Sequence, residues 1–163
     1  MKKLIALAAA LALAVPVVAG LPAAWAGTDQ KTFDVSAEVV PSCVFTASAN
    51  IAFGQLDVHL GTKNADGSLT VKCTPQTVAK IGLDTGLNGT DGQRKISNGA
   101  QAIAYDLYQN VARDVAWKNA DPDRKQFIGD GMDQVHQVYG TLLYSSYVDI
   151  GTYNDTVTAT VEF

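Results

Sequence analysis

Residues 31–40 read Lys-Thr-Phe-Asp-Val-Ser-Ala-Glu-Val-Val, and an apolar side chain recurs at every second position of this stretch. Residues 154–163 repeat the alternation, mostly with threonines between the apolar positions. The two apolar sets are Phe33, Val35, Ala37 and Val39, and Val157, Ala159, Val161 and Phe163. Alternation with a period of two predicts a half-buried β-strand whose backbone edge is open to a neighbour. Because unguarded edge strands promote association, the pattern favours a protein that assembles through these two segments.

The first 26 residues have the features of a secretory signal peptide. A basic start precedes the apolar run of residues 4–18, and residues 24–26 (Ala-Trp-Ala) fit the small-x-small rule for cleavage. We therefore expect cleavage between Ala26 and Gly27. An uncleaved membrane anchor is the alternative, but proline and glycine interrupt the apolar segment, which is short for a membrane span. The remainder has the size of one domain with a core of its own.

The net charge argues against a nucleic-acid partner. The formal charge is −4 at pH 7, and loss of Lys2 and Lys3 with the signal peptide would make the exported chain more acidic. Binding to nucleic acid depends on clustered lysine and arginine that neutralise phosphates. No such cluster is present, so we expect no nucleic acid among the partners.

The chain has two cysteines, Cys43 and Cys73. In an oxidising compartment, an even pair of cysteines is most simply a disulfide. A metal site is the alternative interpretation, although two sulfurs without a nearby histidine make a poor zinc shell.

Short strands with turn signals between them are predicted along the rest of the chain. A turn is expected at residues 64–67, and a turn followed by a strand around Trp117 is favoured over a short helix, because that stretch is rich in poor helix formers. The expected strands cover residues 50–53, 68–74, 78–83, 94–96, 101–108, 126–128, 134–140, 142–144 and 154–163. Roughly seven to nine strands with few helices predict one all-β domain, an antiparallel sandwich.

No set of residues with catalytic or cofactor-binding spacing is apparent. His59 and His136 are far apart in sequence, and Ser145-Ser146 lacks the glycines of a nucleophile elbow. Four aspartates (Asp121, Asp123, Asp130 and Asp133) depart from the spacing of a calcium loop and are interpreted as a solvated acidic loop. Three aromatic residues (Tyr105, Tyr108 and Trp117) fit either a carbohydrate platform or, as we favour, the core. We therefore expect no enzyme, no metal and no cofactor.

Four stretches, taken together and in order, resemble a known family. They are residues 31–44, which contain the N-terminal alternating stretch (residues 31–40, here called the arm) and the first cysteine; residues 69–74 (Leu-Thr-Val-Lys-Cys-Thr); residues 103–108 (Ile-Ala-Tyr-Asp-Leu-Tyr) followed by Trp117; and Val138-Tyr139-Gly140 followed by residues 151–161. In these positions the chain resembles the spore coat protein U domain family, which includes subunits of archaic (Csu-type) chaperone–usher pili. Two stretches depart from the family pattern: the charged residues 118–129 are longer than expected, and residues 141–143 lack an expected arginine and proline.

The resemblance implies an incomplete immunoglobulin-like antiparallel sandwich, completed by donor-strand exchange. It implies a signal peptide at 1–26, a donor strand at 27–40 and a sandwich domain at 41–163. The donor side chains would be Phe33, Val35, Ala37 and Val39. The strand that borders the acceptor groove and pairs with a chaperone would carry Val157, Ala159, Val161 and Phe163, and the cysteines would match the family's disulfide.

The implied partners are identical or related pilin subunits, a periplasmic chaperone and an outer-membrane usher. The implied function is that of a structural subunit of a cell-surface pilus, secreted via the periplasm, which supports surface attachment and biofilm formation. Two other classes stay open at this point: a structural protein of a spore or cyst coat, and a monomeric secreted binding module whose N-terminal strand completes its own sheet.

Overall fold

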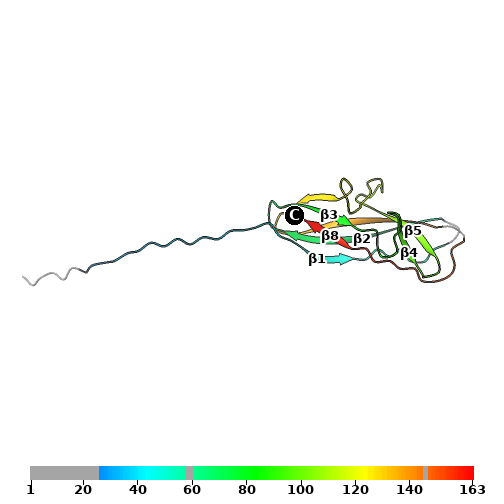
Figure 1. The fold of residues 1–163 in the computed structure, drawn as a ribbon, viewed down its shortest axis with the longest axis horizontal. Coiled ribbons are helices and arrows are strands. Elements are labelled where there is room, and N and C mark those ends of the chain that lie inside the picture. The colour runs from blue at the N-terminus through cyan, green and yellow to red at the C-terminus, as the bar shows by residue number, and fades with distance from the viewer. Residues whose placement is uncertain (1–25, 58–60, 145–146) are drawn as a thin grey trace, which may run out of the picture. The chain divides into compact units, whose positions relative to one another are not determined.

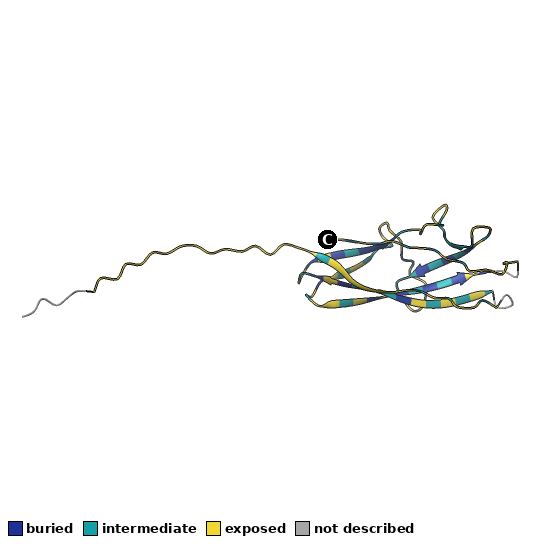
Figure 2. Cartoon of the chain, turned by 90° about the horizontal axis from the view of Figure 1, so that it is seen from below, coloured by how far each residue is buried: buried dark blue, intermediate teal, exposed yellow. Residues whose placement is uncertain are grey.

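The computed structural model describes residues 26–57, 61–144 and 147–163. It divides the chain into two units, residues up to Ala37 and Glu38–Phe163, each described here by itself. Residues 26–37 of the first unit have no regular secondary structure and all are exposed (Figures 1 and 2). Nearly all of the predicted signal peptide lies outside the described residues, which begin at its expected last residue, Ala26.

The second unit is built from strands only, among the residues described. The larger sheet has five strands in the order β1-β2-β7-β5-β4, all antiparallel to their neighbours. The strands are β1 (Cys43–Ala49), β2 (Thr62–Cys73), β7 (Asp133–Leu143), β5 (Ala102–Tyr108) and β4 (Arg94–Ser97). The smaller sheet has the order β6-β3-β8, with β6 at Lys125–Ile128, β3 at Val78–Leu83 and β8 at Ala159–Glu162. The predicted antiparallel all-β fold is therefore confirmed.

The core lies between the two sheets and is filled by alternate side chains of the strands. Val71, Ile81, Trp117 and Leu142 are completely buried. The Trp117 indole N–H donates to the carbonyl of Ile81 at 2.8 Å, so this large side chain is buried without leaving a polar group unpaired. Core packing, rather than a carbohydrate platform, is the role of Trp117 and of Tyr105, which is also buried.

Several predicted elements differ in their boundaries. The predicted turn at residues 64–67 is wrong, because these residues lie inside β2 and pair with β7 over Gly67↔Val138 and its neighbours. The strands predicted at 134–140 and 142–144 are one strand, β7, which pairs with β2 along its whole length. A long partner strand overrides a local turn signal, because each added residue gains ladder hydrogen bonds.

Three predicted strands have little or no strand structure. Residues 31–40 and 50–53 form none, and the strand predicted for 154–163 is reduced to β8 and one bridge between Asn154 and Ser97. Around Trp117, a turn is present but the strand is only a bridge between Tyr108 and Ala116. A strand forms where a neighbouring strand hydrogen-bonds to it along its edge. The segments without strand structure are therefore those that, among the described residues, have no such neighbour.

Candidate interaction groove

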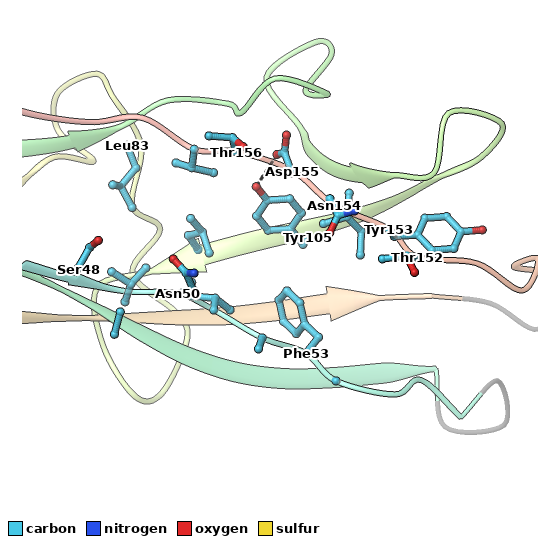
Figure 3. A pocket seen from close by; sticks show the side chains of 18 of the residues that line it. Ser48, Asn50, Phe53, Leu83, Tyr105, Thr152, Tyr153, Asn154, Asp155 and Thr156 are labelled. Atoms are coloured by element: carbon cyan, nitrogen blue, oxygen red, sulfur yellow. Dashed lines mark hydrogen bonds between the residues drawn. The ribbon is translucent and has the colours of Figure 1, made fainter.

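An open groove with a volume of about 1380 Å³ runs along the second unit (Figure 3). Its floor is the inner face of the larger sheet. One wall consists of most of β1 and the segment that follows it, and the other of the extended segment that precedes β8. The floor side chains are Leu69, Ile96, Tyr105, Leu107 and Val138, with Leu83 from β3; the walls are residues 45–56 and 148–157, with Ala159. Leu83, Tyr105, Leu107 and Val138 are at most 5% exposed, and Leu69 and Ile96 are partly buried, so the floor is apolar and lies deep in the groove.

The wall that precedes β8 is bonded along one edge only. The backbone of Asn154 exchanges two hydrogen bonds with Ser97, and the carbonyls of Thr156 and Thr158 accept from the amides of Leu87 and Asp84 at 3.1 and 3.0 Å. In an extended chain, successive residues direct their backbone groups to opposite sides. Accordingly, within the described residues, the backbone groups of Asp155 and Val157 have no hydrogen-bond partner. They form an open strand edge along the groove.

The opposite wall also has an edge without a partner strand. β1 pairs with β2 along one edge, and residues 50–56 then cross the inner face of the larger sheet, where Ile51 and Phe53 lie against Gly140. A Cβ at Gly140 would lie 3.1–3.2 Å from these two side chains, so the close approach favours glycine. Within the described residues, the backbone of 50–56 makes no hydrogen bond. Both walls thus present backbone groups that one additional strand would satisfy.

A partly buried hydrogen bond fixes the β8-side wall to the floor. The Tyr105 hydroxyl donates to Asp155 Oδ2 at 2.6 Å, and the Asn88 amide donates to Asp155 Oδ1 at 3.0 Å. Burial, together with the bond to Asp155, raises the pKa of Tyr105, so the hydroxyl keeps its proton and remains a donor. Gly86, at φ +76°, allows this carboxylate to approach, since a Cβ there would lie 2.0 Å from Oδ2. The β8-side wall is therefore held in place by these contacts.

Arg94, in β4, connects the two sheets. Its guanidinium donates to the carbonyls of Leu83, Asp84 and Trp117 at 2.7–2.8 Å and is almost completely buried. Burial lowers the pKa of Arg94, and nearby acidic groups oppose this, so the side chain stays cationic. These bonds tie β4 of one sheet to the end of β3 in the other.

The structure places the predicted site residues as follows. The predicted donor side chains Phe33, Val35, Ala37 and Val39 are all exposed. Val157 and Ala159 line the groove, Val161 packs against the core, and Phe163 is exposed. Cys43 and Cys73 form a disulfide. Ala26 and Gly27, at the predicted cleavage site, are exposed.

Sequence reasoning missed most of the groove. Of the wall at 45–56, only residues 50–53 were predicted as a strand, because they form a short apolar run that ends at Gly54. The floor residues fall in other predicted strands, and none of them was recognised as a groove lining. Only the tertiary arrangement shows that, among the residues the structure describes, no strand lies between these walls.

The structure describes some of the other candidates weighed on sequence. His59, Ser145 and Ser146 lie outside the described residues. His136 is buried in β7 with its ring 4.5 Å from that of Phe127. Asp121 pairs with Lys80 at 2.8 Å, and the described part of the chain contains no group of three or more potential metal ligands. Nor do those residues include a helix long and apolar enough to cross a membrane.

Comparison with known proteins identifies the family. A family model described as the Spore Coat Protein U domain matches residues 29–160. The chain belongs to this family. Protein U of Myxococcus xanthus is 40% identical over 105 residues, which are 60% of this chain and 59% of protein U. The match therefore spans less than two thirds of that relative.

Solved structures of pilus proteins have the same fold as this spore coat U domain. A chain of the CsuC–CsuE chaperone–tip adhesion subunit pre-assembly complex, from archaic chaperone–usher Csu pili of Acinetobacter baumannii, is 27% identical, with a TM-score of 0.58 over 77% of this chain and 40% of that chain. The P pilus rod subunit PapA gives 17% identity and a TM-score of 0.52 over 74% of this chain and 97% of PapA. A chaperone–usher pilus structure that addresses rod uncoiling gives 15% and 0.50, over 85% and 96%. The immunoglobulin-like fold of pilins, and the predicted likeness to an archaic Csu-type subunit, are confirmed.

Proposed function

We propose that this chain is a structural subunit of an extracellular chaperone–usher pilus and that it polymerises by donor-strand exchange. One observation carries the proposal: the chain combines a groove whose two walls each have one edge without a partner strand with an exposed segment, residues 31–40, that has the alternation of a strand. Insertion of such a segment between the walls would complete the smaller sheet. This is β-augmentation, in which main-chain bonds supply affinity and alternate side chains supply specificity.

The energetics favour a joint that opens slowly. Burial of a large apolar side chain contributes about 1.5–3 kcal/mol, so Phe33, Val35 and Val39 together supply several kcal/mol. Ala37 contributes little and suits a shallow part of the groove. The backbone bonds on both edges add to the barrier for withdrawal, which gives the kinetic stability that a non-covalent fibre requires.

The proposal extends to processing and partners. Residues 1–26 are a signal peptide, residues 27–40 the donor strand, and residues 41–163 the domain that accepts a donor. A periplasmic chaperone would occupy the groove before assembly, pairing with the segment that carries Val157, Ala159, Val161 and Phe163, and an outer-membrane usher would exchange it for the donor of another subunit. The CsuC–CsuE complex, in which a chaperone binds a subunit, supports the chaperone step. On the cell surface the filament would support attachment and biofilm formation.

The test is a pair of substitutions on opposite faces of the donor strand. Val35→Asp places a charge in the apolar groove and should abolish filaments or slow their growth at least tenfold, because a buried unpaired charge is costly. Ser36→Asp, directed away from the groove, is the matched control and should assemble as the parent chain does. Electron microscopy and sedimentation of the exported protein are the measurements. Normal filaments from Val35→Asp would refute the donor assignment.

A second candidate is a structural protein of a spore or cyst coat. The family description and the 40% identity to protein U of Myxococcus xanthus favour it. Assembly through the same groove serves either location, so the discriminating measurement is immunogold labelling of vegetative cells and of dormant forms. Label on filaments of growing cells supports the pilus, and label confined to a coat supports the alternative.

A further inference from the structure

The segment that joins the exposed arm to β1 is short and is held at several points. Only Pro41 and Ser42 separate Val40 from Cys43, the first residue of β1. The amide of Thr74 donates to the carbonyl of Ser42 at 2.9 Å, and the Thr74 hydroxyl donates to the carbonyl of Val40 at 3.3 Å. The Cys43–Cys73 disulfide lies directly beside these contacts. Residues 40–43, which we call the root, are therefore fixed along the end of β2.

The root has a consequence for which groove the arm can enter. The free edge of β1 borders the groove, so an arm that reversed its direction at residues 41–42 would pair with β1 of its own chain. Such an intramolecular closure competes strongly with assembly, because a tethered segment acts at an effective concentration in the millimolar range. A subunit built to polymerise needs a barrier against it.

Pro41 supplies this barrier through its backbone geometry. A two-residue hairpin loop needs a positive φ at its first position, and proline is restricted to φ near −65°. A three-residue loop that begins at Val40 places Pro41 second, where it forces the preceding residue out of the required conformation. Two other loop positions remain. A loop that includes Cys43 would remove this residue from its register with Cys73. A longer loop that includes Val39 would remove this side chain from the part of the arm that enters the groove.

We propose that Pro41 and the Thr74 contacts prevent the arm from filling the groove of its own chain, so that the occupant is the arm of a second copy. This inference rests on the proposed function and adds the choice of partner. The root thus determines which arm can bind. It leaves the interaction surface of the groove unchanged and prevents the arm of the same chain from competing for it.

The experiment replaces the root by a sequence that favours a hairpin. The double variant Pro41→Asn, Ser42→Gly introduces Asn-Gly, the preferred two-residue loop. In the full exported chain we expect at least a tenfold rise in the fraction recovered as monomer, with the arm protected from proteolysis. Ser42→Gly alone, which retains Pro41, is the matched control and should polymerise as the parent chain does. Light scattering after size exclusion and mass spectrometry of proteolytic fragments give the two readouts.

Two outcomes overturn the inference: polymerisation of the double variant at the parent rate, or a parent monomer whose arm is already protected. If the double variant does not fold, as judged by its urea midpoint, insertion of Gly-Ser-Gly-Ser after Val40 tests the same point and should also increase the monomer. A separate chain with Phe33→Asp and Val35→Asp is titrated with a synthetic peptide of residues 28–40. Failure to bind the peptide refutes the proposed function, whereas binding with an unaffected double variant refutes only the role of the root.

Discussion

The N-terminal arm and β5 have the same alternation of apolar and polar residues but opposite surroundings. In β5, Ile103, Tyr105 and Leu107 are 3%, 5% and 3% exposed, whereas Phe33 and Val35 in the arm are 85% and 86% exposed. β5 lies between β4 and β7 and has a partner on both edges. Residues 31–40 have none, within the described part of the chain. The pattern thus specifies the ability to form a strand, and the availability of two edges decides whether the strand forms.

The largest effect on the isolated chain is expected from removal of the disulfide, which anchors the point where the arm meets the sandwich. Its two cysteines are separated by 30 residues, and the chain-entropy model gives about 3–4 kcal/mol for a loop of this size. Cys43→Ala with Cys73→Ala should lower the free energy of unfolding by this amount in urea titrations, and reduction of the parent chain should have a comparable effect. An unchanged midpoint would show that the anchor contributes nothing.

A direct test of the comparison uses one truncation in each region. Ile103→Ala in β5 should cost about 3 kcal/mol in unfolding free energy, because it opens a cavity in the core. Val35→Ala in the arm should change the same quantity by less than about 0.5 kcal/mol, since its side chain is already exposed. In assembled filaments the difference between the costs of the two truncations should become smaller, and Val35→Ala should accelerate the dissociation of subunits. Equal costs in the monomer would mean that the arm is packed there.

Loss of the bond between floor and wall should have an intermediate effect. Tyr105→Phe leaves the Asp155 carboxylate without one donor and should cost about 2 kcal/mol, the typical value for a hydrogen bond to a charged group. Because Asp155 fixes the β8-side wall, donor-peptide binding should also weaken. Thermal unfolding and peptide titration separate the two effects, and an unchanged peptide affinity would show that the wall keeps its position without this contact.

The smallest effect is a pH dependence caused by His136. Burial, together with nearby Lys125, lowers the pKa of His136 below its ordinary value of 6.5. Between the pKa of the folded chain and 6.5, the unfolded chain therefore binds more protons at His136 than the folded chain does. The free energy of unfolding should consequently decrease as the pH falls below 6.5, and the contribution of His136 should be constant above that pH. Unfolding free energies measured between pH 8 and the folded pKa should show the slope, and His136→Gln should remove it.

Asp84 titrates at a lower pH than His136. Burial raises the pKa of Asp84, but the hydrogen bonds that the amides of Thr158 and Gly86 donate to it outweigh burial, and the net effect is a lowered pKa.

The sequence predicted those parts of the fold whose conformation depends on residues close together in the chain. The alternation of residues 78–83 and 101–108 predicted β3 and β5 almost to the residue, because each of these strands has one buried face. The turn predicted at 64–67 failed because pairing with β7, distant in sequence, decided the conformation of these residues.

The groove shows the same limit. Val157 and Ala159, which the family resemblance predicts at the border of an acceptor groove, line the groove, but the wall at 45–56 and the floor at Leu69 and Val138 were not predicted to line it. An open groove is the absence of a strand from a sheet, and local patterning describes only the strands that are present. The buried Arg94, which connects the two sheets through three backbone carbonyls, likewise has no local signature.

Hydrogen exchange of the backbone amides of residues 31–39, compared in assembled and unassembled protein, tests the central claim most directly. The account predicts rapid exchange in the unassembled chain and strong protection in the filament, accompanied by new protection of the open edge at Asp155 and Val157. Rapid exchange of the arm within the filament, or an arm that is already protected in the lone chain, would contradict it.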